Sequence, residues 1–284
     1  MSLSPDAEIT LECNPDNVTD ELLRAYRYAG VNRISLGVQS MIAHVLRSLG
    51  RLHDIDNVKA SVDAIGLAGF NSFNIDLIYG TVGESLDDWR VTINEVLALG
   101  PLHVSAYGLT VEAGTPLAED PLRAPDDDDQ ADKYQLADDL LSDAGLINYE
   151  ISNWAQPGYE CRHNFLYWGQ GNYRGFGCAA HSHQDGRRWW NVRTPERYLA
   201  LIGAGESPEA GAETLDDEGR VLERLQLTLR TRSGVPRGAL SPQDVGEGGR
   251  LEGLVESKDD HWVLTRNGRL LANEVALALR LPPD

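Results

Sequence analysis

The stretch "NIDLIYGTVGES", residues 74–85, decides the fold, because it joins a buried strand to a helix through a turn with two glycines. The apolar run Phe73–Tyr79 predicts a strand whose two faces are both covered by packing. Gly80 and Gly83 loosen the following turn, and the segment Leu86–Leu99 predicts a helix that ends before Gly100. Strand, turn and helix in this order indicate one unit of a parallel α/β sheet.

The same unit recurs on both sides of this stretch. Further strands are predicted at Ile9–Cys13, Arg33–Val38 and His103–Leu109, and further helices at Asp20–Ala29, Met41–Leu49 and Val58–Ala68. Thr19 and Ser40 are the expected N-caps of the first two helices. Four units are too few to close an eight-stranded barrel, so we expect an incomplete, TIM-like parallel β/α barrel. The open edge of its first strand predicts either a truncated N-terminus or a homodimer through that edge.

After Pro121 the pattern changes, and a helix at Gln130–Ala144 and a strand at Asn148–Ser152 are expected. The acidic run 126–129 before that helix predicts a solvated loop. An aromatic, histidine-rich loop, a helix at Glu196–Ala204 and a polar linker at Ser207–Thr214 follow. We therefore predict two domains, 1–205 and 206–284. The second is expected to be a small winged-helix-like α+β domain, with helices at Asp217–Arg230 and Gly249–Leu254, a two-stranded wing through residues 263–265 and a final helix.

Composition excludes several classes of function. The formal net charge of −19 makes sequence-independent nucleic-acid binding unfavourable. The sequence has no apolar run of about 20 residues and no signal-peptide pattern, which predicts a soluble, cytoplasmic protein. The three cysteines, Cys13, Cys161 and Cys178, form no C-x-x-C pair, so a disulfide framework is not expected.

Polar residues end successive predicted strands. They are Glu12, Gln39, the segment Asp76–Tyr79 and Thr110. In parallel β/α folds the carboxyl ends of the strands meet at one mouth, where functional side chains gather. The alternatives for such residues are helix caps and hydrogen bonds between strands.

The segment "ECRHNFLYWGQGNYRGFGCAAHSH", residues 160–183, combines cysteines, histidines, aromatics and glycines. A zinc site would use Cys161, His163, Cys178 and His181 or His183, but the spacing is unfamiliar. A nucleophilic triad from neighbouring residues such as His181, Ser182 and Asp185 is disfavoured, because triad members meet through the fold. Another interpretation of this segment is a loop of glycines and aromatic residues whose histidines form hydrogen bonds with the backbone.

Seven blocks of the sequence resemble one protein family. They are "LECNPD" (11–16), "RISLGVQS" (33–40), "LGRLH" (49–53), "NIDLIYGTVGES" (74–85), "YEISNWAQPG" (149–158), "HNFLYW" (163–168) and "GCAAHS" (177–182). Together they resemble the oxygen-independent coproporphyrinogen III oxidase-like family of radical S-adenosylmethionine (SAM) proteins, and in particular its HemW-type haem-chaperone branch. The resemblance covers essentially the whole chain.

The resemblance implies a SAM site at the strand ends. By motif, Glu12, Gln39, Arg51 and Asp76 would contact SAM, with Thr110 nearby. Carboxylates and an amide suit ribose hydroxyls and an ammonium group, and an arginine suits a carboxylate. The C-x-x-x-C-x-x-C motif that holds the family's 4Fe-4S cluster is absent from this sequence, as is the glycine-rich segment of the next strand. We therefore expect an N-terminally truncated member that binds no cluster.

The block "HNFLYW" is similar to the H-N-x-x-Y-W block of the haem-chaperone branch. The resemblance implies that His163 ligates haem iron while Tyr167 and Trp168 cover the macrocycle, with His181 and His183 as further candidates. The expected function is a haem-binding chaperone that delivers haem to membrane-associated acceptors. The alternative is an oxygen-independent coproporphyrinogen III oxidase, which converts propionates to vinyl groups, and the missing cluster cysteines disfavour it for this chain. A third possibility is a truncated, inactive scaffold.

Overall fold

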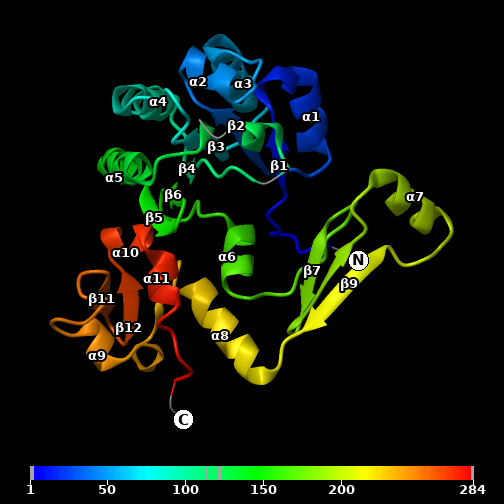
Figure 1. The fold of residues 1–284 in the computed structure, drawn as a ribbon. Coiled ribbons are helices and arrows are strands. Elements are labelled where there is room, and N and C mark those ends of the chain that lie inside the picture. Colours follow the sequence, from blue (N-terminus) through cyan, green and yellow to red (C-terminus); the bar gives the residue numbers. More distant parts are fainter. Residues whose placement is uncertain (1–2, 113, 121–122, 283–284) are drawn as a thin grey trace. The chain divides into compact units, whose positions relative to one another are not determined.

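The computed structural model describes residues 3–112, 114–120 and 123–282. The chain forms two compact units, Met1–Glu160 and Cys161–Asp284 (Figure 1). This division differs from the boundary predicted at residue 205. The predicted linker Ser207–Thr214 was wrong, because strand β9 (Glu209–Thr214) occupies most of it and pairs with β8 (Arg187–Asn191).

A six-stranded sheet in the order β1-β2-β3-β4-β6-β5 forms the centre of the first unit. Its strands are β1 (Thr10–Cys13), β2 (Arg33–Gln39), β3 (Phe73–Tyr79), β4 (His103–Gly108), β5 (Ile147–Glu150) and β6 (Asn153–Ala155). Strands β1 to β4 are parallel to their neighbours, whereas β6 is antiparallel to β4 and to β5. The parallel α/β architecture is therefore confirmed, and the short strand β6 is an element that the sequence did not predict.

The helices of this unit lie along one side of the sheet (Figure 1). They are α1 (Asp20–Tyr28), α2 (Ala43–Ser48), α3 (Ile55–Leu67), α4 (Leu86–Ala98) and α5 (Asp127–Asp143), with short 3₁₀ turns η1 (Pro15–Asn17) and η2 (Pro116–Glu119). Thr19 caps α1 as predicted, since its hydroxyl accepts a hydrogen bond from the amide of Leu22. Capping boxes start α3 and α4.

Two predicted helix starts were wrong. Ser40 does not cap α2, because the N-cap residue of this helix is Ile42. The Ser40 hydroxyl instead accepts a hydrogen bond from the backbone amide of Ile42 at 3.1 Å. The acidic run 126–129 is not a solvated loop, because it forms the first turn of α5, and Asp126 accepts the amide of Asp129 at 2.8 Å. Carboxylates at a helix N-terminus are stabilised by its dipole, which explains why the N-cap Asp126 is followed by three helical aspartates.

The two faces of the parallel strands differ in polarity. Ile34, Leu36, Ile75 and Leu77 alternate along β2 and β3 and are completely buried. The residues between them are polar and make up the opposite face, which includes Ser35, Asn74, Asp76 and Ser105. The prediction of strands that pack apolar side chains on both faces therefore holds for one face only. The polar face leads to the candidate site.

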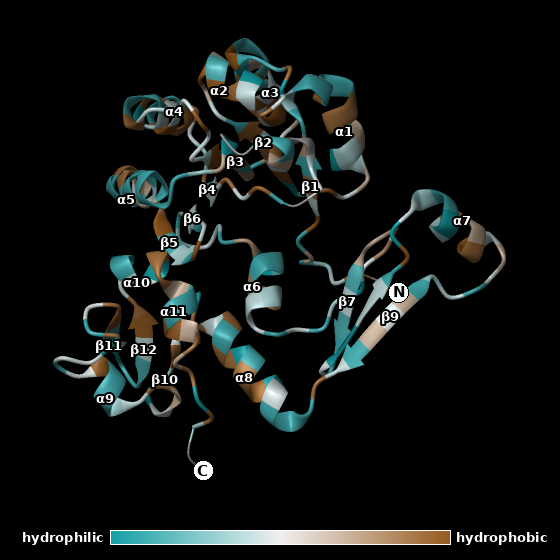
Figure 2. Cartoon of the chain, viewed as in Figure 1, coloured by the Kyte–Doolittle hydropathy of each residue, from teal (hydrophilic) through white to brown (hydrophobic). Residues whose placement is uncertain are grey.

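The second unit begins with a helix where the sequence predicted a loop. Helix α6 (Arg162–Trp168) contains the "HNFLYW" block. The strands β7 (His181–Gln184), β8 and β9 form an antiparallel sheet, followed by α8 (Asp217–Thr228). Helix α7 (Pro195–Gly203) has no buried side chain, although Figure 2 shows hydrophobic residues on it.

The C-terminal segment has its own three-stranded sheet and core. It contains β10 (Val235–Pro236), η4 (Arg237–Ala239), α9 (Pro242–Val245), β11 (Val255–Lys258), β12 (His261–Leu264), α10 (Arg266–Leu270) and α11 (Ala272–Ala276). Leu229, Val235 and Val275 are fully buried in its hydrophobic core. The helix predicted at Gly249–Leu254 was wrong: these residues form turns, as the flanking and internal glycines favour. Among the described residues, no helix combines the length and apolar character needed to cross a lipid bilayer.

Candidate functional site

A cavity of ≈560 Å³ lies at the carboxyl ends of strands β1 to β4. Its lining includes all five residues that the sequence analysis assigned to SAM: Glu12, Gln39, Arg51, Asp76 and Thr110. They come from β1, β2, the segment after α2, β3 and the segment after β4, so only the folded sheet brings them together. Their convergence in one cavity confirms the geometric part of the prediction.

The Asp76 carboxylate is held by the polar face of the sheet. Ser35 Oγ donates to its Oδ2 and Asn74 Nδ2 donates to its Oδ1, each at 2.7 Å. Asn74 Oδ1 in turn contacts His103 Nδ1 at 2.5 Å, and His103 Nε2 contacts the Tyr149 hydroxyl at 2.8 Å. A buried hydrogen-bond network of this kind fixes the orientation of the carboxylate before any ligand arrives.

His103 stays neutral in this network. Burial lowers the pKa of His103 well below its usual value, and the nearby charge of Arg33 lowers it further. A neutral imidazole can donate from one nitrogen and accept at the other, which matches its two contacts. Asp76 is the member of this network that supplies a carboxyl group to the cavity lining.

Gln39 ends β2 in an unusual backbone conformation. Its φ is +67°, in the left-handed region, and the pairing register with β3 shifts between Gly37 and Gln39. A Cβ at Gly37 would lie 3.0 Å from Gln39 Nε2, so the glycine makes room for the amide side chain. Backbone strain of this kind, on the order of 1 kcal/mol, concentrates at functional sites.

Arg51 supplies a positive charge to the cavity. Its backbone amide donates to the carbonyl of Leu46 at 2.9 Å, which anchors the residue just after α2. In the described part of the chain, its guanidinium forms no ion pair, although Glu12 and Asp76 line the same cavity. The cavity thus offers two carboxylates and one unpaired cation, which is the combination that a zwitterionic ligand requires.

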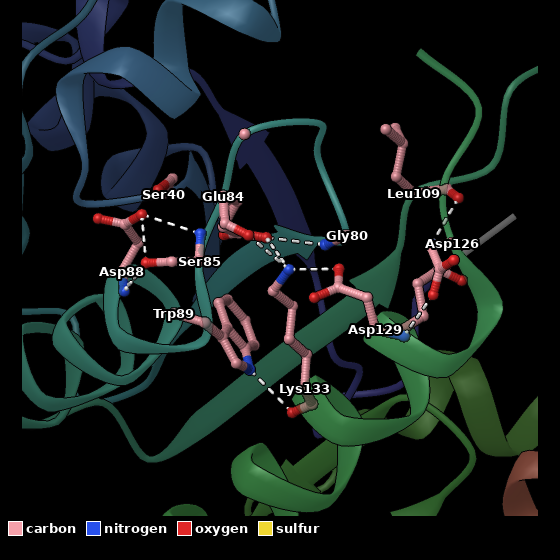
Figure 3. Close-up of polar contacts among 12 residues, drawn as sticks. Ser40, Gly80, Glu84, Ser85, Asp88, Trp89, Leu109, Asp126, Asp129 and Lys133 are labelled. Atoms are coloured by element: carbon pink, nitrogen blue, oxygen red, sulfur yellow. Dashed lines mark hydrogen bonds and ion pairs between the residues drawn. The ribbon is translucent and has the colours of Figure 1, made fainter. Parts of the chain in front are cut away.

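An ionic cluster with a buried centre, which we call the Lys133 brace, joins α5 to the segment that follows β3 (Figure 3). It consists of Lys133, Glu84 and Asp129, and the side chains of Lys133 and Glu84 are completely buried. Lys133 Nζ donates to the Glu84 carbonyl at 2.7 Å, lies 3.6 Å from Glu84 Oε2, and also pairs with Asp129. Burial raises the pKa of Glu84 to about 6, while the Gly80 amide and the Lys133 charge act in the opposite direction.

The brace holds the backbone that borders the cavity. Glu84 Oε2 accepts the amide of Gly80 at 2.8 Å. Gly80 has φ +84°, and a Cβ there would lie 2.6 Å from Gln130 Cγ, so only glycine fits this slot. Gln130 Nε2 donates to the carbonyl of Leu109, a cavity residue, at 2.9 Å. Helix α5 therefore fastens both the turn after β3 and the end of β4.

The predicted haem residues lie on α6. His163 and Tyr167 are four residues apart, and their ring centroids are 4.5 Å apart in an edge-on arrangement. Tyr167 contacts Tyr173 at the same centroid distance. Both His163 and Tyr167 are exposed, and Trp168 is the last residue of the helix. One short helix thus presents the imidazole and the aromatic ring on the same face.

The other two histidines of this region, His181 and His183, differ in whether their ring nitrogens are available to bind haem iron. His183 is buried, its Nδ1 contacts the Gly171 carbonyl at 2.9 Å, and its Nε2 accepts the amide of Gly186 at 3.1 Å. Both ring nitrogens are therefore engaged with the backbone, and the prediction of His183 as a reserve haem ligand was wrong. His181 is exposed and packs against Trp190 with a centroid distance of 5.9 Å.

Metal-binding alternatives find no support in the part of the chain that the structure describes. It contains no group of three or more His, Cys, Asp or Glu residues that could hold a metal ion. Cys13 ends β1 in the first unit, whereas Cys161 and Cys178 belong to the second. In sequence, the three cysteines do not have the C-x-x-x-C-x-x-C spacing of the family's cluster motif.

The parallel strands of the sheet end at a cavity, and residues 2–96 match the model of the Radical SAM superfamily, which gives the class of this protein. The solved coproporphyrinogen III oxidase (HemN) from Escherichia coli has the same fold, with a TM-score of 0.81 over 96% of this chain and 69% of that one, at 21% identity. The chain itself belongs to the HemW family. It is 41% identical over 283 residues to a protein of Mycobacterium tuberculosis named "Heme chaperone HemW", covering 98% of this chain and 73% of the relative. Relatives of the same name from Escherichia coli and Bacillus subtilis are 35% and 31% identical, over 97% and 95% of this chain and 75% of each relative.

Proposed function

We propose that this protein is a haem-binding chaperone that holds SAM in the strand-end cavity and haem at α6. The family supports the haem part, because the HemW relatives are named heme chaperones. The strand-end cavity supports the SAM part, because five motif residues converge there. The oxidase alternative has weaker support, since the HemN likeness at 21% identity concerns the fold alone. Membrane-associated haem proteins are the proposed acceptors.

Two finer features of the architecture belong to this proposal. The sheet of the first unit would be an incomplete barrel whose polar face encloses the cosubstrate. Residues 206–284, with α8 as the first helix, would be a winged-helix-like module that packs against other parts of the protein. The separate buried core around Leu229 and Val275 supports this second feature.

The cavity residues suit the chemical groups of SAM. Asp76 and Glu12 would accept hydrogen bonds from ribose hydroxyls or the methionine ammonium, and Gln39 would bond to the ribose through its amide. Arg51 would pair with the methionine carboxylate. When bound, SAM supplies an adenosyl group and an activated sulfonium. Because the sequence lacks the C-x-x-x-C-x-x-C motif, no radical step is assigned to these residues.

Haem would bind against α6. His163 would ligate the iron, and the ring of Tyr167, held by Tyr173, would pack against the macrocycle. Trp168 would extend this apolar contact. His181 is the remaining candidate for a second ligand, since the backbone engages both nitrogens of His183.

Titration with haemin tests the haem site. We expect a Soret band for the wild-type protein that shifts and weakens in His163→Ala, because loss of the imidazole changes the axial ligation of the iron. His261→Ala is the matched control, since it removes an exposed histidine of the same unit that the proposed haem site does not use. Identical spectra for the wild type and His163→Ala would show that another group binds the iron.

The edge strand β1 gives a second expectation. Within the described residues, β1 pairs only with β2. We propose that this edge pairs with a second copy of the chain. In the parallel pairing with β2, the amides of Leu11 and Cys13 face β2, so Thr10 and Glu12 carry the amides of the open edge. Amides of Thr10 and Glu12 should then exchange faster with deuterium at low protein concentration than at high concentration, whereas amides of β3 should not respond. Concentration-independent protection of β1 together with a monomeric mass would contradict the dimer.

A further inference from the structure

The second unit contains a cavity of ≈510 Å³ that neither proposed site uses. Its floor is formed by Trp189 and Asn191 of β8, which are 7% and 6% exposed. Alternate residues of a strand point to opposite faces, so Trp189 and Asn191 share the face opposite to Arg188. Arg188 is directly opposite His183 in the β7–β8 pairing, which places His183 on the other face from the cavity. A volume of this size is typical of small-molecule sites.

Two guanidinium groups lie over the buried indole of Trp189. The Arg187 Cζ is 4.9 Å and the Arg174 Cζ is 5.4 Å from the ring centroid. Arg187 already has an anionic partner, because its Nη2 lies 2.6 Å from Glu209 Oε1. Arg174 pairs with no carboxylate among the residues that the structure describes.

The carboxylates of this cavity have partners of their own. Glu209 pairs with Arg187, and Asp185 Oδ1 accepts a hydrogen bond from Asn172 Nδ2 at 3.0 Å. The Arg174 guanidinium is therefore available to pair with the anionic group of a bound ligand. This is notable in a chain with 44 acidic and only 25 basic residues, where most cations can find a carboxylate.

Two exposed apolar side chains line the cavity, and hydrogen bonds fix the backbone next to one of them. Phe176 is 82% exposed, and Ile202 of α7 is 50% exposed. The residue after Phe176, Gly177, has φ +101°, its amide donates to the Tyr198 hydroxyl at 3.1 Å, and its carbonyl accepts Asn191 Nδ2 at 2.8 Å. An exposed ring on a fixed backbone offers a stacking surface that loses little conformational entropy on binding.

We infer that this cavity binds a planar aromatic molecule that carries a carboxylate. Phe176 and Ile202 contact the ring system, and Arg174 pairs with the carboxylate through its planar fork. Trp189 stacks beneath Arg174 and keeps the guanidinium oriented. This site is separate from the strand-end cavity and from the histidine of α6, so it goes beyond the proposed function.

Equilibrium dialysis with 2-naphthoate and its neutral analogue 2-naphthalenemethanol tests this inference. We expect the wild-type protein to bind the carboxylate roughly tenfold more tightly or better, because only the carboxylate pairs with Arg174. Arg174→Gln should remove this preference, and Phe176→Ala should weaken both compounds. Arg187→Gln should reduce the preference for the carboxylate less than Arg174→Gln does, because the Arg187 guanidinium already forms an ion pair with Glu209. Arg197→Gln, an exposed arginine of α7 outside the cavity lining, should bind like the wild type.

Three results would overturn the inference. They are no binding of naphthoate to the folded wild type, equal affinity for the two compounds, and an unchanged preference in Arg174→Gln. Circular dichroism of each variant establishes that it is folded. His163→Ala should leave naphthoate binding unchanged, so a failure of the haem proposal is distinguishable from a failure here.

Discussion

Lys133→Met is expected to lower the free energy of unfolding by about 3–5 kcal/mol, because removal of one partner leaves a buried charge uncompensated. Lys133 and Glu84 are both completely enclosed, and the Lys133 ammonium also pairs with Asp129. Methionine keeps the length and apolar character of the side chain, so the variant tests charge rather than packing. Urea denaturation followed by circular dichroism measures the loss.

Lys59→Met is the matched control for this variant. Lys59 also lies on a helix and pairs with a glutamate, Glu95, at 3.5 Å, but both side chains are about half exposed. Exposed pairs of this kind contribute about 0–1 kcal/mol. If Lys59→Met and Lys133→Met destabilise the protein equally, the brace has no special role in stability.

The loss in Lys133→Met should grow between pH 5 and pH 8. Burial already raises the pKa of Glu84 to about 6, and removal of the Lys133 charge raises it further. A carboxyl whose folded pKa is raised contributes stability at low pH and loses it as the pH rises through that pKa. Glu84→Gln in the Lys133→Met background should therefore restore part of the stability at pH 8 and little at pH 5.

Arg51→Gln should weaken SAM binding by roughly 10- to 150-fold, which corresponds to about 1.5–3 kcal/mol for a hydrogen bond to a charged group. The guanidinium lines the strand-end cavity without an ion pair among the described residues, so its charge is available to the methionine carboxylate. Glutamine keeps polarity but removes the cation. Isothermal titration calorimetry measures the affinity of each variant.

Ligand fragments sharpen this test. 5′-Methylthioadenosine lacks the amino-acid carboxylate, so the wild type and Arg51→Gln should bind it equally. Arg47→Gln, four residues away on α2 and outside the cavity lining, should bind SAM like the wild type. No SAM binding by the wild type would reject the cosubstrate proposal, whereas equal SAM affinity in Arg51→Gln would reject only the role of Arg51.

The long parallel strands were predictable because their signal is local. The run Phe73–Tyr79 is strongly apolar and ends at a glycine turn, and the structure places β3 at the same residues. The shorter strands β6 and β9 were missed, because short polar segments become strands only through their pairing partners. Helix α6 was missed for a related reason, since seven residues rich in aromatics have little helical tendency alone.

The candidate site also has a part that the sequence could predict and a part that it could not. Glu12, Gln39, Asp76 and Thr110 could be found from strand ends, and Arg51 from its motif, because parallel strands all end at one mouth. The Lys133 brace could not be found so directly, because Lys133 and Glu84 are separated by 49 positions in the chain. The only local sign was the spacing of Asp129 and Lys133 on one helix face.

The enclosure of Lys133 has a practical consequence for amine-directed chemistry. The chain contains three lysines, Lys59, Lys133 and Lys258. With Lys133 sealed from reagents, acylation of the native protein should modify the other two side chains, which are accessible and belong to different units. A homobifunctional cross-linker of known span that joins Lys59 to Lys258 would then act as a molecular ruler between the two units.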